Sequence, residues 1–254
     1  VKVCLSGDGA DELFGGYNRH RAFWHWHKNG FKSQVAGFLG KYIGAGSREN
    51  SKSDWKRKIS AFASLKGIDS KEIYLHLSSF TDRQLCQEVF GVGLKLPFEI
   101  DDQNALQSYL MLDQAFILPN DMLHKVDVMS MAHGLEVRTP FLDHRLVEWA
   151  NAQGADEKFN GSDGKIMLRQ AAREWIPGEI LDRPKSGFEI PVESWLRGPL
   201  KPYLTQAISQ IKNDLGWINA ERLDSILSEF ESGASQHSSL MWTTMILGQW
   251  LKRN

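Results

Sequence analysis

The sequence predicts a mainly α-helical chain that opens on one short β-strand. Two observations carry this prediction: apolar residues alternate only at the start, and further on they recur at helical spacing. One strand followed by many helices is odd for a whole domain and plausible for one part of an α/β domain. The opening strand pattern, without an initiator methionine, leads us to expect a fragment of a longer chain.

Composition and charge exclude several classes of protein. The 254 residues contain 30 Lys and Arg against 31 Asp and Glu, which gives a formal net charge of −1. A dedicated nucleic-acid or anionic-membrane binder normally has a basic excess, so we expect neither partner. Cys4 and Cys86 are too few for a disulfide scaffold, and no apolar run approaches the roughly 18–20 residues of a membrane helix. We therefore expect a reduced, cytoplasmic protein.

The strand is expected at residues 2–6. Val1, Val3 and Leu5 alternate there, and the pattern is typical of a buried strand. The small and acidic residues 6–12 turn the chain, and a short apolar helix face follows until Gly15-Gly16. No second convincing β-run follows in the sequence.

Helices are expected over most of the remaining chain. Apolar residues over 106–117 follow a 3–4 spacing, and Pro119 predicts a break. Asn120-Asp121 stands where the N-cap of a second helix, Met122 to Met131, would lie. Asp143 is expected to cap a helix over 145–151.

Two further helices are predicted nearer the end of the chain. Met167, Ala171 and Trp175 lie on one face of a helix that Pro177 ends. The apolar residues of 240–251 form the stripe of a last amphipathic helix.

The first candidate site is the glycine turn after the strand. Backbone N–H groups of such a turn can bind an anion, Ser6 adds a hydroxyl, and Gly7 and Gly9 let a phosphate approach closely. Asp8 and Asp11 would repel a bare phosphate, and they make sense if magnesium bridges them to it. An ordinary strand–helix connection with Asp as a cap accounts for the same residues.

The second candidate lies in residues 125–143, where charged side chains stand in a segment too hydrophobic to be fully exposed. Glu136 with Arg138, and Lys125 with Asp127, are natural ion pairs of a purely structural kind. An amino-acid substrate pocket would need the same residues, a cation for a carboxylate and an anion for an ammonium.

The third candidate is the loop 183–188, Arg-Pro-Lys-Ser-Gly-Phe. Pro184 and Gly187 flank Lys185, whose ammonium is either solvated or placed to stabilise charge on a phosphate. The histidines at 20, 25 and 27 have no acidic or Cys partner at metal-site spacing, so no zinc site is expected there.

Four segments, taken in this order, resemble the glutamine-hydrolysing asparagine synthetases. Residues 6–17 are similar to the family's second ATP-site loop, and 125–143 to its central signature. Residues 164–169 and 183–188 are similar to its C-terminal motifs. Several co-linear motifs are far more specific than any one of them alone.

The resemblance implies that residues 1–254 are part of a synthetase domain of the α/β ATP-pyrophosphatase (adenine nucleotide alpha hydrolase-like) type. In that family the domain follows a glutaminase domain. The implied cofactors are ATP and Mg²⁺. The implied reaction is adenylation of the aspartate side chain, followed by attack of glutamine-derived ammonia on β-aspartyl-AMP.

Roles follow position by position from the same resemblance. Ser6, Gly7 and Gly9 would bind ATP, and Asp11 would hold magnesium on the pyrophosphate. Asp8 would stand where the family places a carboxylate important for the acyl-adenylate, although some relatives have glutamate there. Lys185 would steady the phosphates as pyrophosphate leaves. Lys125, Asp127, Glu136 and Arg138 are the expected substrate-pocket residues.

Two features of the family do not occur in this sequence. The first pyrophosphate loop, Ser-Gly-Gly-x-Asp-Ser, and the glutaminase domain are both missing, and we expect both upstream of Val1. The chain alone is therefore predicted not to make asparagine. We also expect it to self-associate, because an uncovered sheet would expose an apolar patch.

Other functions remain open at this point. A β-lactam synthetase or a peptide cyclase also adenylates a carboxylate, but a tyrosine at the position of Asp8 would have favoured lactam closure. A non-catalytic helical module that kept the motifs as scaffold is the alternative from another class.

Overall fold

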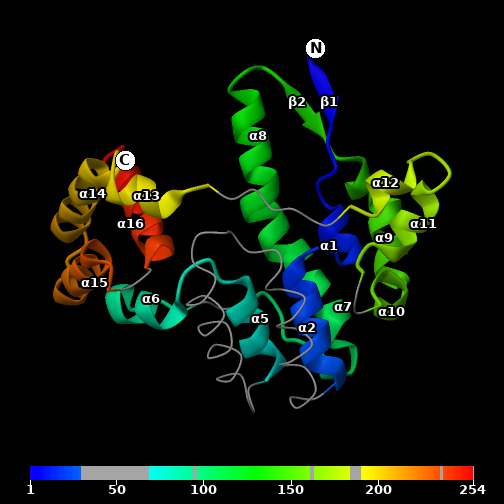
Figure 1. Ribbon diagram of the computed structural model, residues 1–254, viewed down its shortest axis with the longest axis horizontal. Helices are drawn as coiled ribbons and strands as arrows, with labels where there is room; N and C mark the ends of the chain where they lie inside the picture. Colours follow the sequence, from blue (N-terminus) through cyan, green and yellow to red (C-terminus); the bar gives the residue numbers. More distant parts are fainter. Residues whose placement is uncertain (30–68, 94–95, 161–162, 184–189, 235–236, 254) are drawn as a thin grey trace. The chain divides into compact units, whose positions relative to one another are not determined.

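A computed structural model of the chain describes residues 1–29, 69–93, 96–160, 163–183, 190–234 and 237–253 (Figure 1). The chain forms two compact units, which are treated separately below. The first comprises residues 1–77 with 96–186, and the second 78–95 with 187–254. Among the described helices, none combines the length and the apolar character that crossing a lipid bilayer requires.

The first unit contains all the predicted site residues that the structure describes. Its elements are, in chain order, β1 (Val3–Leu5), α1 (Ala10–Phe14), α2 (Asn18–Asn29), α5 (Ser70–Ser78), η2 (Asp102–Asn104), α7 (Ala105–Leu112), η3 (Asp113–Leu123), α8 (His124–Met131), β2 (Glu136–Arg138), η4 (Pro140–Leu142), α9 (His144–Ala152), α10 (Ala155–Lys158), α11 (Ile166–Ala172) and α12 (Gly178–Leu181). The prediction of a mainly helical chain with an N-terminal strand is confirmed.

The structure has a second strand that the sequence analysis missed. β2 pairs with β1 in parallel, with Val3 opposite Glu136 and Leu5 opposite Arg138 (Figure 1). Three residues are too few to display a period-2 pattern, and this strand lies inside a charged segment, so sequence periodicity could not identify it.

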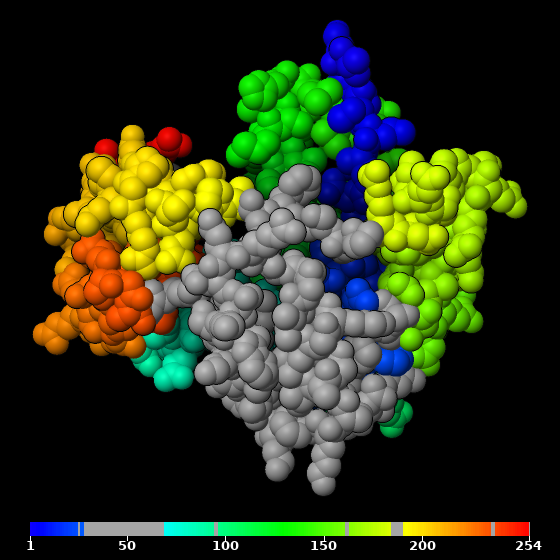
Figure 2. All heavy atoms as spheres, viewed as in Figure 1, coloured from blue at the N-terminus to red at the C-terminus, as the bar shows by residue number. Residues whose placement is uncertain are grey.

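The expectation that the first strand is buried is wrong for the described structure. Val3 is 38% exposed and Leu5 is 70% exposed. Figure 2 shows the first residues (blue) at the surface beside the green atoms of α8 and β2. Among the described residues the sheet has only two strands of three residues each, so β1 is an edge strand.

The helix break predicted at Pro119 is also wrong. Residues 105–131 form one continuous helical path, because η3 is a π-helical stretch that joins α7 to α8 and contains Pro119. A π-helical stretch accommodates the missing N–H of proline that would disrupt regular α-helix. The side-chain amide of Asn120 donates to the carbonyl of Phe116 at 2.8 Å and so satisfies one acceptor there. Asn120 therefore supports a helix interior and caps no new helix.

Two apolar cores hold the first unit together. The larger joins α2, α5 and α7 around Phe23, Tyr74 and Tyr109. The smaller packs Leu13 and Phe14 of α1 against Ala150 of α9. The second core fixes α1, which directly follows the glycine turn, to the rest of the unit. Asp143 caps α9 as predicted, since its carboxylate accepts the N–H of Arg145 at 3.0 Å.

The second unit is a helical cluster. Its elements are α6 (Arg83–Phe90), α13 (Val192–Arg197), α14 (Lys201–Asp214), α15 (Ala220–Ser232) and α16 (Ser238–Leu251). α14 and α16 pack so closely that a side chain on Gly248 would overlap Ala207. Leu240 and Thr244 of α16 are buried, which confirms the predicted apolar stripe of the last helix.

Candidate active site

The pairing of β1 with β2 brings the glycine turn next to the central segment, residues 125–143. The N–H of Ser6 donates to the carbonyl of Arg138 at 2.9 Å, directly beyond the last paired residues of the two strands. Gly9 has a φ of 91°, and any side chain on it would overlap Leu142. Glycine is needed at this position for both reasons. Two motifs that lie more than a hundred residues apart in sequence therefore form one local structure.

The side chains of the turn are ordered by a local hydrogen bond. Ser6 Oγ donates to the carboxylate of Asp8 at 2.6 Å. Both residues are half-buried and Gly7 is exposed, so the turn can be reached from solvent. This arrangement presents a hydroxyl, a carboxylate and an accessible backbone side by side.

Asp11 points toward a different motif. Its carboxylate forms an ion pair with Lys165 at 3.1 Å, and both side chains remain partly exposed. The N–H of Lys165 donates to the carbonyl of Phe14 at 2.9 Å. The segment 164–169, which the sequence analysis assigned to a C-terminal motif, is thereby attached to α1.

A pocket of about 480 Å³ opens at this ion pair. Its lining combines four cations and three carboxylates with small polar groups: Asp11, Gly16, Asn18, Arg21, Asp163, Gly164, Lys165, Arg169, Ile180, Leu181, Asp182 and Arg183. The mixture of Arg, Lys and Asp suits a polar, charged ligand better than an apolar one.

The third candidate, Lys185, lies outside the described residues. Arg183, two positions earlier in the chain, lines the same pocket as Asp11. The structure therefore brings the start of the loop 183–188 to the site, and the position of Lys185 itself stays a prediction.

The second candidate is more exposed than expected. Arg138 Nε donates to Glu136 at 2.7 Å, so that predicted pair is present, and this hydrogen bond raises the pKa of Arg138. The predicted pair of Lys125 and Asp127 is not found, and the Lys125 ammonium lies 3.6 Å from the sulfur of Met122. Both Lys125 and Asp127 are exposed on α8. The segment is nevertheless not fully exposed, as expected, because Val137, Phe141 and Leu142 are half-buried.

A buried polar cluster supports the far end of the glycine motif. Tyr17 donates its hydroxyl to Glu12 at 2.7 Å, and the guanidinium of Arg19 lies 4.1 Å from the centre of the Tyr17 ring. Burial and the bond to Glu12 raise the pKa of Tyr17 far above its usual range, so the phenol remains a donor. Arg19 and His20 both bind the carboxylate of Asp113 on η3.

Magnesium fits the described residues as an ion that takes one protein carboxylate and completes its shell with water or phosphate oxygens. Among these residues no group of three or more His, Cys, Asp or Glu could hold a metal. Asp11 supplies one partly exposed carboxylate at the pocket. Mg²⁺ commonly takes one or two protein carboxylates and completes its shell with phosphate oxygens and water, and Asp11 meets that requirement.

The sequence analysis missed several residues of this pocket, two of them near the glycine motif. Asn18 and Arg21 lie on α2 and face the pocket together. Their i, i+3 spacing directly after the glycine motif is a signal that could have identified them, because residues so spaced share one helix face.

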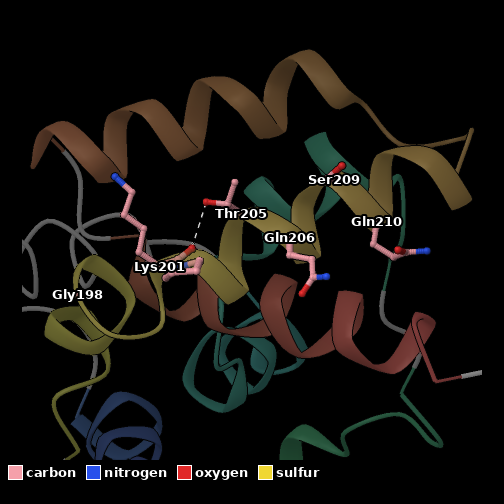
Figure 3. A pocket seen from close by; sticks show the side chains of 7 residues that line it. Gly198, Lys201, Thr205, Gln206, Ser209 and Gln210 are labelled. Carbon is pink, nitrogen blue, oxygen red and sulfur yellow. Dashed lines mark hydrogen bonds between the residues drawn. The ribbon is translucent and has the colours of Figure 1, made fainter.

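A second hollow, of about 880 Å³, belongs to the second unit (Figure 3). It is lined by Gly198 and by side chains that recur along one face of α14, among them Lys201, Thr205 and Ser209. The Thr205 hydroxyl donates to the carbonyl of Lys201 at 3.1 Å. None of the predicted site residues lines it.

Comparisons with known proteins agree with the motifs. The family described as Asparagine synthase matches residues 1–252. A protein of Mycobacterium tuberculosis strain H37Rv, whose name places it among the glutamine-hydrolysing asparagine synthetases, is 30% identical over 98% of this chain and 39% of its own length. Asparagine synthetase [glutamine-hydrolyzing] 1 of Bacillus subtilis is 27% identical over 98% of this chain and 40% of its own length. The chain thus spans about two fifths of these relatives, and no solved structure matches it.

Proposed function

The chain belongs to the asparagine synthase family, and from that premise we propose that it is part of an enzyme that converts L-aspartate to L-asparagine with ATP. Domains of this family have the ATP-pyrophosphatase type of fold, and the family uses ATP. The observation that carries the proposal is the meeting of the motif segments. The central segment pairs with the strand before Ser6, while Lys165 and Arg183 both line the pocket beside Asp11.

The proposed first step is adenylation of the aspartate side chain. The carboxylate attacks the α-phosphorus of ATP, pyrophosphate leaves, and β-aspartyl-AMP forms. Ser6, Gly7 and Gly9 bind phosphate through the hydroxyl and the accessible backbone of the turn. Asp8, held by Ser6 at 2.6 Å, orients the reacting groups.

Charge neutralisation is the second part of the proposal. Magnesium, held by Asp11, would neutralise the pyrophosphate oxygens. Lys185 would add a cation as pyrophosphate departs, and the place of Arg183 in the pocket supports this role. The reaction then needs little covalent chemistry from the protein, since positioning and electrostatic stabilisation supply most of the catalysis of phosphoryl chemistry.

The amino-acid pocket is proposed around the central segment. Glu136 and Arg138 lie on β2, beside the strand that leads into Ser6, and they carry the opposite charges that an amino acid requires. Lys125 and Asp127 are retained as pocket residues of the full-length enzyme, where their exposure leaves them free to contact a substrate. Ammonia from glutamine, made by a glutaminase domain of the longer enzyme, would then attack β-aspartyl-AMP.

We further propose that residues 1–254 are one part of the synthetase domain and are inactive alone. The Ser-Gly-Gly-x-Asp-Ser loop does not occur in them, and the curated relatives are about 2.5 times longer. The test is aspartate-dependent pyrophosphate release. The full-length protein should release it, its Asp8→Ala variant should not, and the 254-residue chain should not. Release by the chain, abolished by Asp8→Ala, would overturn the proposed inactivity.

A scaffold without catalytic function is distinguished by binding. Isothermal titration of the full-length protein with Mg²⁺–ATP and then with aspartate should give heat for both ligands. A scaffold would give heat with neither, and this outcome would end the proposal of an adenylating enzyme. A product that lacks asparagine, with pyrophosphate still released, would favour the lactam synthetase or peptide cyclase alternative.

A further inference from the structure

The ion pair between Asp11 and Lys165 is held in place by the backbone of both segments. Lys165 has a φ of 57°, and it is the one non-glycine residue with positive φ in the described part of the chain. This conformation is disfavoured for a side-chain-bearing residue, so the surrounding structure must impose it. The bond from the Lys165 N–H to the carbonyl of Phe14 does so, at 2.9 Å.

Two glycines make room for the pair. Any side chain on Gly164 would overlap the carbonyl oxygen of Gly15, so these two backbones touch. Any side chain on Gly16 would overlap both the Asp11 carboxylate and the Lys165 side chain. The pair therefore occupies a space that only glycine leaves open.

Both oxygens of the Asp11 carboxylate already have neighbours. Oδ2 lies 3.1 Å from the ammonium of Lys165, and Oδ1 lies directly against Gly16. A divalent cation brought within bonding distance of this carboxylate would meet the ammonium at close range, and two cations so near each other repel. A metal can take Asp11 fully only if the ammonium withdraws.

We propose that Lys165 is the resident counter-ion of Asp11 and that a divalent cation binds Asp11 by exchange with its ammonium. This inference rests on the proposed function, which makes Asp11 the magnesium carboxylate. The displaced ammonium stays inside the pocket, which Asp163 and Asp182 also line. Lys165 is thus a positioning residue: it keeps the Asp11 carboxylate neutralised and oriented until the metal arrives.

The test measures Mn²⁺ alone, as a spectroscopic substitute for Mg²⁺, by the loss of its free electron paramagnetic resonance signal. The 254-residue chain suffices, since every residue of the inference lies in it. Lys165→Met removes the ammonium at similar length and should tighten the Mn²⁺ dissociation constant by roughly fivefold, the size expected for a partly exposed ion pair. Arg169→Met removes another cation of the same pocket and should change the Mn²⁺ dissociation constant by less than about twofold.

Lys165→Gly provides a second variant that is safe for folding. Glycine adopts a φ of 57° without strain, so this change removes the ammonium and relieves the backbone together. Both Lys165 variants should bind Mn²⁺ more tightly than the wild type, and Asp11→Asn should weaken Mn²⁺ binding. Thermal unfolding in EDTA, followed by circular dichroism, verifies that each variant is folded.

Equal, weaker or no Mn²⁺ binding by folded Lys165→Met and Lys165→Gly would overturn the exchange. If Asp11→Asn binds Mn²⁺ as the wild type does, the metal role of Asp11 is overturned as well. Neither result decides whether the full-length enzyme adenylates aspartate, because that is measured separately by pyrophosphate release and Asp8→Ala.

Discussion

The Nε2 atom of His20 lies 2.7 Å from Oδ2 of Asp113, and both side chains are fully buried. The N–H of Tyr17 approaches the other ring nitrogen of His20 at 3.4 Å. That nitrogen, Nδ1, must therefore accept the hydrogen bond from Tyr17. The proton of the ring is then on Nε2, which donates a hydrogen bond to Asp113. Burial is the main cause that lowers the pKa of His20 below its usual value, against the influence of Asp113, which agrees with a neutral ring.

Asp113 is expected to be ionised in the same cluster. Burial by itself would raise its pKa, but the hydrogen bonds from His20 and Arg19 and the charge of Arg19 together lower it. The charge of Asp113 is thus balanced by Arg19, which binds it at 2.8 Å, and not by histidine. The cluster contains one buried ion pair with a neutral histidine beside it.

Replacing this carboxylate should destabilise the protein strongly. Asp113→Asn leaves Arg19 without its counter-ion, and breaking a buried pair costs about 3 kcal/mol or more. Urea unfolding followed by circular dichroism measures the loss. Tyr74→Phe is the matched control, because it removes the 3.2 Å hydrogen bond from Tyr74 to Asp113, leaves the ion pair in place and should cost about 1 kcal/mol. If the two variants lose equal stability, the buried ion pair is not the important interaction.

Acid should destabilise the protein through His20. A base whose pKa is lower in the folded than in the unfolded state binds fewer protons when folded, so stability falls as pH drops below about 6.5. His20→Gln can still donate to Asp113 but cannot be protonated. Its urea midpoint should therefore change less between pH 7 and pH 5 than that of the wild type. An equal change in both proteins would contradict the assignment of a neutral His20.

Lys158 should make stability depend on alkaline pH. Its side chain is fully buried and donates to Gln107 at 2.9 Å, and burial lowers the pKa of Lys158 from 10.5 to about 8. The unfolded chain then binds more protons between these two values, so stability rises with pH from about 8 to 10.5, by up to about 3 kcal/mol.

Lys158→Met should abolish this rise, as measured by urea unfolding at pH 7 and pH 10. Lys252→Met, at an exposed position, is the control and should keep it. A rise that persists in Lys158→Met would have to come from another group, and the interpretation of Lys158 would be wrong.

Gly164 should not tolerate a side chain. An added Cβ would overlap the backbone oxygen of Gly15, which cannot move aside as a flexible side chain can. Gly164→Ala should therefore cost about 2 kcal/mol or more and lower the melting temperature. Gly154→Ala, where nothing lies within 4 Å of the new Cβ, should change it little. Similar melting temperatures for the two variants would contradict the close contact.

The expected self-association should involve the exposed apolar residues of the small sheet and α8. Leu5 is 70% exposed and Met129 is 64% exposed. Light scattering of the chain at high concentration should detect species larger than a monomer. The double variant Leu5→Lys, Met129→Lys should lower the measured molar mass toward that of the monomer. Val92→Lys, in the second unit, should not. A wild type that is monomeric throughout would refute this expectation.

Local sequence rules predicted the elements that depend on neighbouring residues. The turn after Leu5, the end of α1 at Gly15 and the Asp143 cap follow from glycine and capping preferences that act over a few residues. The π-helical passage around Pro119 could not be predicted in this way. Local preference disfavours proline in a helix, and the packing of the whole helix overrides it.

Sequence alone determined the family, because several motifs stand in order along the chain. It also placed Ser6, Asp8 and Asp11 in the one segment that leads from the strand into the first helix. Only the tertiary structure decided which distant residues meet that turn: Arg138 by strand pairing and Lys165 by an ion pair. Contacts of this kind depend on how the helices pack, and no periodicity along the chain records them.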